Sequence, residues 1–144
     1  LTLCNWVWPM TMSPSKSRDY RGDLDLEAKF YKAVTGEDIT TEELYKRGAA
    51  ILTLQRANPM RGMKTNEFRG VHDTITEWPF TKDPDIQPFT AGTDKMEKED
   101  FQTALTMVYK EFGWDEKTGA PTAECLDNYN LTDVKEDLQS KGLL

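Results

Sequence analysis

The residues best suited to metal or redox chemistry are the two cysteines, Cys4 and Cys125. A thiolate is a soft ligand that suits iron–sulfur clusters, but a cluster of four irons needs about four such ligands. Cys125 lies on an expected short helix with no ligand-like spacing around it, and a lone cysteine is usually a small buried hydrophobe. From residue type alone, both cysteines are therefore interpreted as packing residues.

The single histidine, His72, stands beside Asp73 and close to Glu77. A histidine with carboxylates nearby could act as an acid–base pair or ligate a metal. Adjacent residues rarely point at one spot, however, and no second histidine or spaced cysteine completes a metal site. We interpret His72 as a loop residue with local hydrogen bonds, and a role in catalysis or in lining a substrate channel stays open.

Helical patterns dominate the segments that must position these residues. A helix is predicted over 24–34, capped by Asp23 and stopped by Gly36. A second helix follows a capping box formed by Thr40 and Glu43, and Pro59 is expected to end it. Its predicted core stripe, which should meet Phe30, Tyr31 and Val34 of the preceding helix, is Leu44, Gly48, Ile51, Leu52 and Gln55. Gly48 in this stripe predicts close approach of a neighbouring backbone.

The region from Met60 to Thr93 has no helical period and predicts a long irregular loop. After it, Asp94 and Glu97 repeat the spacing of a capping box. The following helix, which ends at Gly113, should pack one apolar face against the stripe that begins at Leu44; this face consists of Phe101, Leu105, Val108, Tyr109 and Phe112. Two short helices, with Thr122 and Thr132 as caps, complete the prediction.

Composition excludes some classes of function. The chain has 18 basic and 25 acidic residues, a net charge of −7, so clustered basic side chains for nucleic-acid binding are not expected. No apolar run approaches the ~20 residues that cross a bilayer. Two cysteines in a domain of this size give no disulfide framework, which favours a reducing, cytoplasmic location.

The chain starts with Leu1 and lacks a basic leader, so we expect a piece of a longer chain. Its apolar opening, residues 1–12, is expected to pack against a part of that chain that is missing here.

The order of structural residues around the second helix resembles that of a known family. Thr-Gly-Glu-Asp-Ile-Thr from Thr35, the Gly-Ala-Ala-Ile-Leu run from Gly48, and Gln-Arg-Ala-Asn from Gln55 are similar to the C-terminal helical domain of the aldehyde ferredoxin oxidoreductases. Gly-Trp-Asp from Gly113 and Gly-Ala-Pro-Thr from Gly119 also match the closing segment of that family. The resemblance implies an all-α, multihelical C-terminal domain, residues 1–144, of a larger enzyme whose cofactor-binding N-terminal and middle domains precede it.

The resemblance also implies cofactors and a role for the first cysteine. Family members carry a tungsten (sometimes molybdenum) bis-pterin and a 4Fe-4S cluster. Leu-Thr-Leu-Cys resembles the end of a motif whose cysteine is the last cluster ligand, so Cys4 is implied as a 4Fe-4S ligand and Leu3, Cys4 and Asn5 as pterin-binding residues. Thr2 replaces the family glycine. The three other cysteine ligands, in a Cys-x-x-Cys-x-x-x-Cys run, are absent from this sequence, so no cofactor is expected on this chain alone.

The implied activity is oxidation of aldehydes to carboxylic acids, with electrons passed to ferredoxin or another carrier. The family's own loop carries an arginine, an Asp-Asp and a Leu-Pro, and Arg61, Asp73 and Ile75 stand in those places. No catalytic residue is implied in this chain, so the chain by itself is expected to be inactive. Two alternatives stay open: a related enzyme that acts on another substrate, such as an aromatic thioester, and a non-catalytic helical protein-interaction module.

Overall fold

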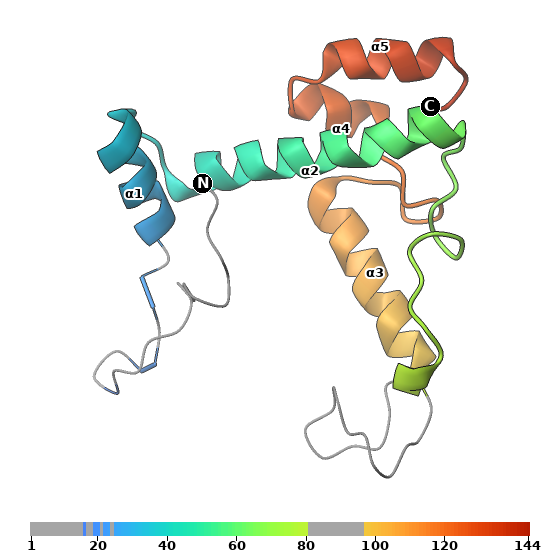
Figure 1. Ribbon diagram of the computed structural model, residues 1–144, viewed down its shortest axis with the longest axis horizontal. Coiled ribbons are helices and arrows are strands. Elements are labelled where there is room, and N and C mark those ends of the chain that lie inside the picture. Colours follow the sequence, from blue (N-terminus) through green and yellow to red (C-terminus); the bar gives the residue numbers. More distant parts are fainter. Residues whose placement is uncertain (1–15, 17–18, 21, 24, 81–96) are drawn as a thin grey trace. The chain divides into compact units, whose positions relative to one another are not determined.

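The computed structural model describes residues 16, 19–20, 22–23, 25–80 and 97–144. Over these residues the fold is all-α, as the sequence predicts (Figure 1). The elements are α1 (Leu26–Thr35), α2 (Thr41–Met63), the 3-10 turn η2 (Trp78–Phe80), α3 (Lys98–Phe112), α4 (Ala123–Asn128) and α5 (Thr132–Ser140). The strand-like pairing in the described part consists of two isolated bridges, Arg69 with Asp73 and Trp114 with Pro121. The apolar opening predicted over residues 1–12 lies outside the described residues.

The chain divides into two compact units between Gly48 and Ala49. In the first unit, α1 begins at Leu26, two residues later than predicted, and its N-cap is Asp25, so the prediction that Asp23 caps the helix is wrong. The Asp23 carboxylate instead accepts hydrogen bonds from the Asp25 amide and the Lys29 ammonium. Gly36, at a φ of 76°, ends the helix as predicted. Val34 is 78% exposed, so the expectation that it packs on the next helix is wrong.

The start of α2 is the capping box that the sequence predicts. The Glu43 amide donates to the Thr40 hydroxyl at 3.1 Å, and the Thr40 amide donates to the Glu43 carboxylate at 2.8 Å. Each side chain therefore satisfies an amide that the helix leaves without a partner.

The end of α2 corrects the prediction, because the helix runs through Pro59 to Met63. A proline inside a helix removes one hydrogen bond and costs about 3 kcal/mol. The extra turn carries Met60, whose side chain is fully buried at 0% exposure. Burying a side chain of this size stabilises by about 1.5–3 kcal/mol, which offsets most of the proline's cost.

The buried face of α2 is not the predicted one. Thr53, Ala57 and Met60 are buried, whereas Ile51 is 60% and Leu52 is 47% exposed. A Cβ built on Gly48 would meet nothing within 4 Å, so the predicted close approach of a backbone is also wrong over the described residues.

The core of the second unit forms where α2 meets the loop after it and the C-terminal helices (Figure 1). Leu131 and Val134 pack against a cluster made of Ala57, Met60, Phe68, Ala120, Leu126, Leu138 and Leu143. On α3, Tyr109 is buried at 1% exposure, but Val108 is 45% exposed, so the predicted apolar face is only partly covered. The prediction that this face of α3 packs against the α2 stripe that begins at Leu44 is wrong too, because Ile51 and Leu52 of that stripe are exposed.

The ends of the last three helices follow local signals. Gly113, at a φ of 71°, ends α3 as predicted, while α3 begins at Lys98 and the predicted cap Asp94 lies outside the described residues. The Thr122 hydroxyl accepts from the Cys125 amide at 3.1 Å, which confirms the cap of α4. Thr132 is the first residue of α5 and not its cap, which is Leu131. No helix in the described ranges is long and apolar enough to span a bilayer.

Candidate functional site

The cofactor-binding residues implied by the resemblance, Leu3, Cys4 and Asn5, lie outside the described residues. Their geometry therefore contributes nothing to the site that follows. The other cysteine, Cys125, is 3% exposed, and its thiol donates to the Phe112 carbonyl at 3.0 Å. Burial raises the pKa of this thiol, which keeps it in the protonated form that packs best. The packing role predicted for Cys125 is confirmed.

The structure separates the three titratable residues of the loop. His72 is exposed, and its ring lies 5.7 Å from the Phe68 ring. Glu77 is exposed and pairs with Lys98 at 2.9 Å. Asp73 points toward α2, where it meets Arg56. These residues do not converge, so they form neither an acid–base pair nor a metal site with one another.

Arg56, Asp73 and Tyr109 instead form a half-buried polar cluster. The Arg56 guanidinium donates to both Asp73 oxygens, at 2.8 Å to Oδ1 and by a second, shorter contact to Oδ2. The Tyr109 hydroxyl donates to Asp73 Oδ2 at 2.6 Å. Arg56 Nε also donates to the Gly119 carbonyl at 2.9 Å. The Asp73 carboxylate thus joins the loop to α2 and α3, and Arg56 extends the cluster to the turn before α4.

Aromatic rings enclose the guanidinium of this cluster. The Arg56 Cζ lies 4.3 Å from the centre of the Phe68 ring and 4.8 Å from that of the Trp114 ring. Each contact is of a kind worth about 0.5–2 kcal/mol, depending on desolvation. The Arg56 and Asp73 side chains are only 15% and 17% exposed, so water screens their attraction less than that of a surface pair.

The electrostatics of the cluster follow from this geometry. Burial by itself would raise the pKa of the Asp73 carboxyl, but the hydrogen bonds from Arg56 and Tyr109 outweigh it and hold that pKa below its ordinary value. For Tyr109, burial first and then the bond to Asp73 raise the pKa to about 12. At neutral pH the aspartate is therefore charged and the tyrosine is a hydrogen-bond donor.

Gly119 is required by the close packing of this cluster. A Cβ at this position would lie 2.8 Å from the Cζ and hydroxyl oxygen of Tyr109 and 3.1 Å from Asp73 Oδ2. The backbone also has a φ of 74°, which favours glycine. The Gly-Ala-Pro-Thr stretch therefore has a structural role, since it brings its carbonyl to Arg56.

An open pocket of about 370 Å³ lies over the cluster. Its lining consists of Arg56, Asp73, Thr74, Ile75, Phe101, Leu105, Val108, Tyr109 and Trp114. The exposed part of the α3 apolar face is one of its walls. The cluster's charges are already bonded to one another, so this arrangement serves to position the loop and α3 and offers no activated acid, base or nucleophile.

Sequence reasoning missed both arginines that organise the second unit. Arg69 donates to the Gln102 carbonyl at 2.8 Å, the Thr106 hydroxyl at 2.9 Å and the Glu116 carbonyl at 2.6 Å. It thereby fastens the loop to α3 and to the following turn. For Arg56, the sequence offers one signal: it lies on α2 near Thr53 and Ala57, so the stem of its side chain lies on the buried side of the helix.

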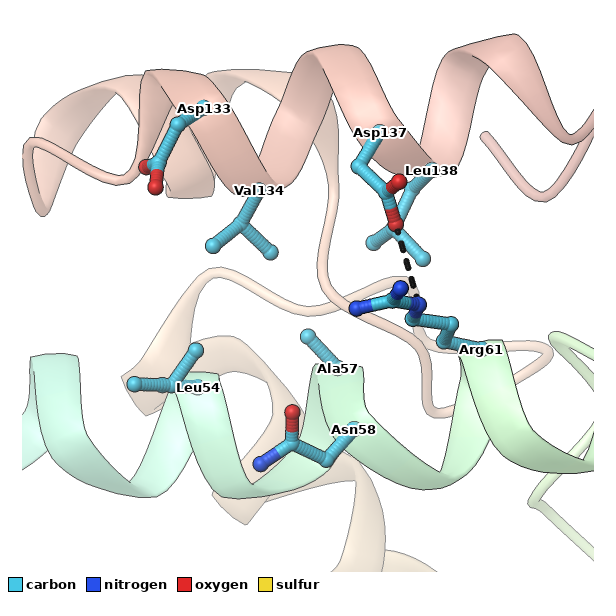
Figure 2. A pocket seen from close by; sticks show the side chains of 8 residues that line it. All are labelled: Leu54, Ala57, Asn58, Arg61, Asp133, Val134, Asp137 and Leu138. Atoms are coloured by element: carbon cyan, nitrogen blue, oxygen red, sulfur yellow. Dashed lines mark ion pairs between the residues drawn. The ribbon is translucent and has the colours of Figure 1, made fainter.

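A second cavity lies between α2 and α5 (Figure 2). Its volume is about 300 Å³, and Figure 2 shows side chains from the two helices facing each other across it. Arg61 of α2 and Asp137 of α5 lie 3.6 Å apart at one end. This distance is too long for a good hydrogen bond, so the contact is a loose ion pair.

The described residues do not fit a metal centre by themselves. Within ranges 25–80 and 97–144, no group of three or more histidine, cysteine, aspartate or glutamate side chains could hold a metal ion. Because Cys4 would supply a single thiolate, this chain alone does not provide the ligands of a four-iron cluster. No chemical step is therefore assigned to such a cluster from the geometry.

The comparison with known families bears on most of the chain. No solved structure matches it. The family model described as "Aldehyde ferredoxin oxidoreductase, domains 2 & 3" matches residues 1–131, which include Cys4, the capping box of α2 and the Arg56–Asp73–Tyr109 cluster. With the all-α fold, this match shows that the chain belongs to the aldehyde ferredoxin oxidoreductase family.

Proposed function

We propose that this chain works as the C-terminal helical part of an enzyme that oxidises aldehydes to carboxylic acids and passes the electrons to ferredoxin or another carrier. The proposal is supported by the family match, which begins at residue 1 and continues to residue 131. The upstream domains of the same polypeptide would supply the catalytic groups. The cytoplasm is the proposed location.

In this proposal, Cys4 is the chain's contribution to the redox centre. When bound, a tungsten or molybdenum bis-pterin would supply two-electron chemistry, and a 4Fe-4S cluster would transfer the electrons singly. Cys4 would donate one thiolate to the cluster, and Leu3 and Asn5 would contact the pterin. Thiolates suit iron–sulfur clusters, and a sequence match that includes Cys4 is the observation that carries this assignment.

The described residues would act as a scaffold for that centre. The polar cluster joins four segments, because Asp73 accepts from Arg56 and Tyr109 and Arg56 also donates to the Gly119 carbonyl. Placement errors on the order of 1 Å are enough to impair catalysis, so a rigid support matters even far from the reacting atoms.

The experiment is metal analysis of the intact protein, purified without oxygen. Iron together with tungsten or molybdenum is expected, as are the electron paramagnetic resonance signal of a reduced cluster and dye reduction with an aldehyde. Cys4→Ser should lose the cluster signal or change it strongly. Cys125→Ser is the matched control, because that thiol is buried and bonded to a carbonyl. A protein with neither iron nor tungsten or molybdenum would overturn the proposal.

A non-catalytic helical interaction module is the second candidate, and one observation favours it. The exposed Ile51 and Leu52 side chains place apolar surface on α2 that nothing among the described residues covers. The same metal analysis separates the candidates, because an interaction module would contain neither metal nor cluster. Activity toward an aromatic thioester in place of an aldehyde would keep the cofactors and change only the substrate class.

A further inference from the structure

The groove between α2 and α5 is lined by both apolar and charged side chains (Figure 2). From α2 come Leu54, Ala57, Asn58 and Arg61, and from α5 come Asp133, Val134, Asp137 and Leu138. Ala57 and Leu138 are buried and close the floor. Leu54, which lines the groove as well, is 38% exposed and offers apolar surface to a ligand.

The two carboxylates of the groove differ in their partners. Asp137 pairs closely with Lys141, one turn further along α5, and loosely with Arg61 at 3.6 Å. Asp133 has neither an ion pair nor a side-chain hydrogen bond among the described residues, although it lines the same groove. In Figure 2, Asp133 and Leu54 lie at one end of the groove, and Arg61 and Asp137 lie at the other. The first end therefore combines a carboxylate that has no ion-pair partner among the described residues with exposed apolar surface.

We propose that this groove is a docking site for a segment of a partner protein that carries a lysine or arginine beside an apolar side chain. Lysine and arginine lay an apolar stem on apolar surface while the charged head stays near water and its partner. Such a stem would lie on Leu54 and Val134, and its head would meet Asp133. The cavity of about 300 Å³ has room for a small number of side chains and not for a whole helix.

Charge complementarity selects this class of partner. An acidic segment would meet the Asp133 carboxylate, and the net charge of −7 on the whole chain would repel it further. The family match ends at residue 131, so α5, which supplies half of the groove, lies beyond the matched residues. Asp133, which carries the proposal, lies beyond the matched residues and apart from the residues proposed to hold the cofactors.

The probe is a short peptide of alternating lysine and leucine, titrated into the intact protein at low salt and followed by fluorescence anisotropy. Asp133→Asn is expected to weaken binding by about threefold, the size expected for one exposed charge pair. Glu136→Gln is the matched control, because it removes the same charge from an exposed residue of α5 that does not line the groove. Leu54→Ser should weaken binding by about threefold as well, through loss of the apolar wall.

The outcomes separate the possibilities. Equal weakening by Asp133→Asn and Glu136→Gln would show diffuse attraction to an acidic surface and overturn the proposal. Equal binding of a leucine-free lysine peptide, or of a glutamate–leucine peptide, would overturn it as well. If the protein self-associates and Asp133→Asn abolishes that self-association, the occupant of the groove is a second copy of the chain instead. Metal content and aldehyde oxidation should be unchanged in Asp133→Asn, so failure here leaves the proposed enzyme function intact.

Discussion

The two faces of α2 belong to one helix and differ in what covers them. Thr53, Ala57 and Met60 are buried under the core of the second unit, while Ile51 and Leu52 on another face are 60% and 47% exposed. The more apolar face is thus the exposed one. The difference shows that the buried face is selected by close fit and not by apolar content alone, because Ala57 and Met60 pack in one cluster with Phe68, Leu126 and Leu138.

The largest expected effect comes from truncating the buried face. Met60→Ala should lower the free energy of unfolding by about 2–5 kcal/mol, the range for a methionine removed from a packed core. Ile51→Ala should change it by less than about 0.5 kcal/mol, as for other surface substitutions. Urea unfolding followed by circular dichroism measures both. Similar losses in the two variants would mean that the exposed face is covered in solution.

The two arginines that flank these faces give the next contrast. Arg56→Ala should destabilise by about 3 kcal/mol, near the lower end for removal of one partner from a buried pair, because Asp73 would keep a charge without its counter-ion. The Arg56 side chain is 15% exposed, while that of Arg61 is 66% exposed. Arg61→Ala should therefore leave the unfolding midpoint unchanged. If both variants lost stability equally, the Arg56–Asp73 pair would be no more than a surface contact.

Acid titration sharpens the same contrast through Asp73. Its pKa is held below the ordinary value in the folded protein, so the unfolded chain takes up this proton first. The stability that Asp73 contributes is complete above its ordinary pKa of about 4 and is lost as the pH falls through the lowered folded value. Unfolding measured between neutral and acidic pH should show the gap between wild type and Arg56→Ala narrowing in that window. A gap that stays constant into acid would show that the pair does not set this pKa.

Local signals account for what the sequence predicted well. The capping box of Thr40 and Glu43, the stops at Gly36 and Gly113, and the Thr122 cap each depend on residues within one turn of a helix. Such interactions are set before the helices pack. The residues that carry the resemblance include Gly36, Thr40 and Gly113, and the family match confirms the resemblance.

Contacts between residues far apart in the sequence account for the features that could not be predicted from it. Arg56 and Asp73 are 17 residues apart, and Asp73 and Tyr109 are 36 apart, so no spacing rule links them. The face of α2 was assigned by apolar content, although fit against distant residues decided it. A proline inside a helical pattern predicts the end of the helix, but α2 continues through Pro59. The burial of Met60, one residue later, favours this extra turn, and that burial depends on the assembled core and is not visible in the sequence. The roles of Leu3, Cys4 and Asn5 stay predictions.

The smallest expected effect has the opposite sign and concerns Gly48. A Cβ there would meet nothing within 4 Å, and the residue lies inside α2, where glycine costs about 0.5–1 kcal/mol relative to alanine. Gly48→Ala should therefore raise the free energy of unfolding by up to about 1 kcal/mol. Gly119→Ala is the control of opposite sign, since its Cβ would lie 2.8 Å from the Tyr109 hydroxyl at a positive φ. A loss of stability in Gly48→Ala would reveal a surface that covers this part of the exposed face, because only a close neighbour makes an added methyl group unfavourable at an unstrained helical position.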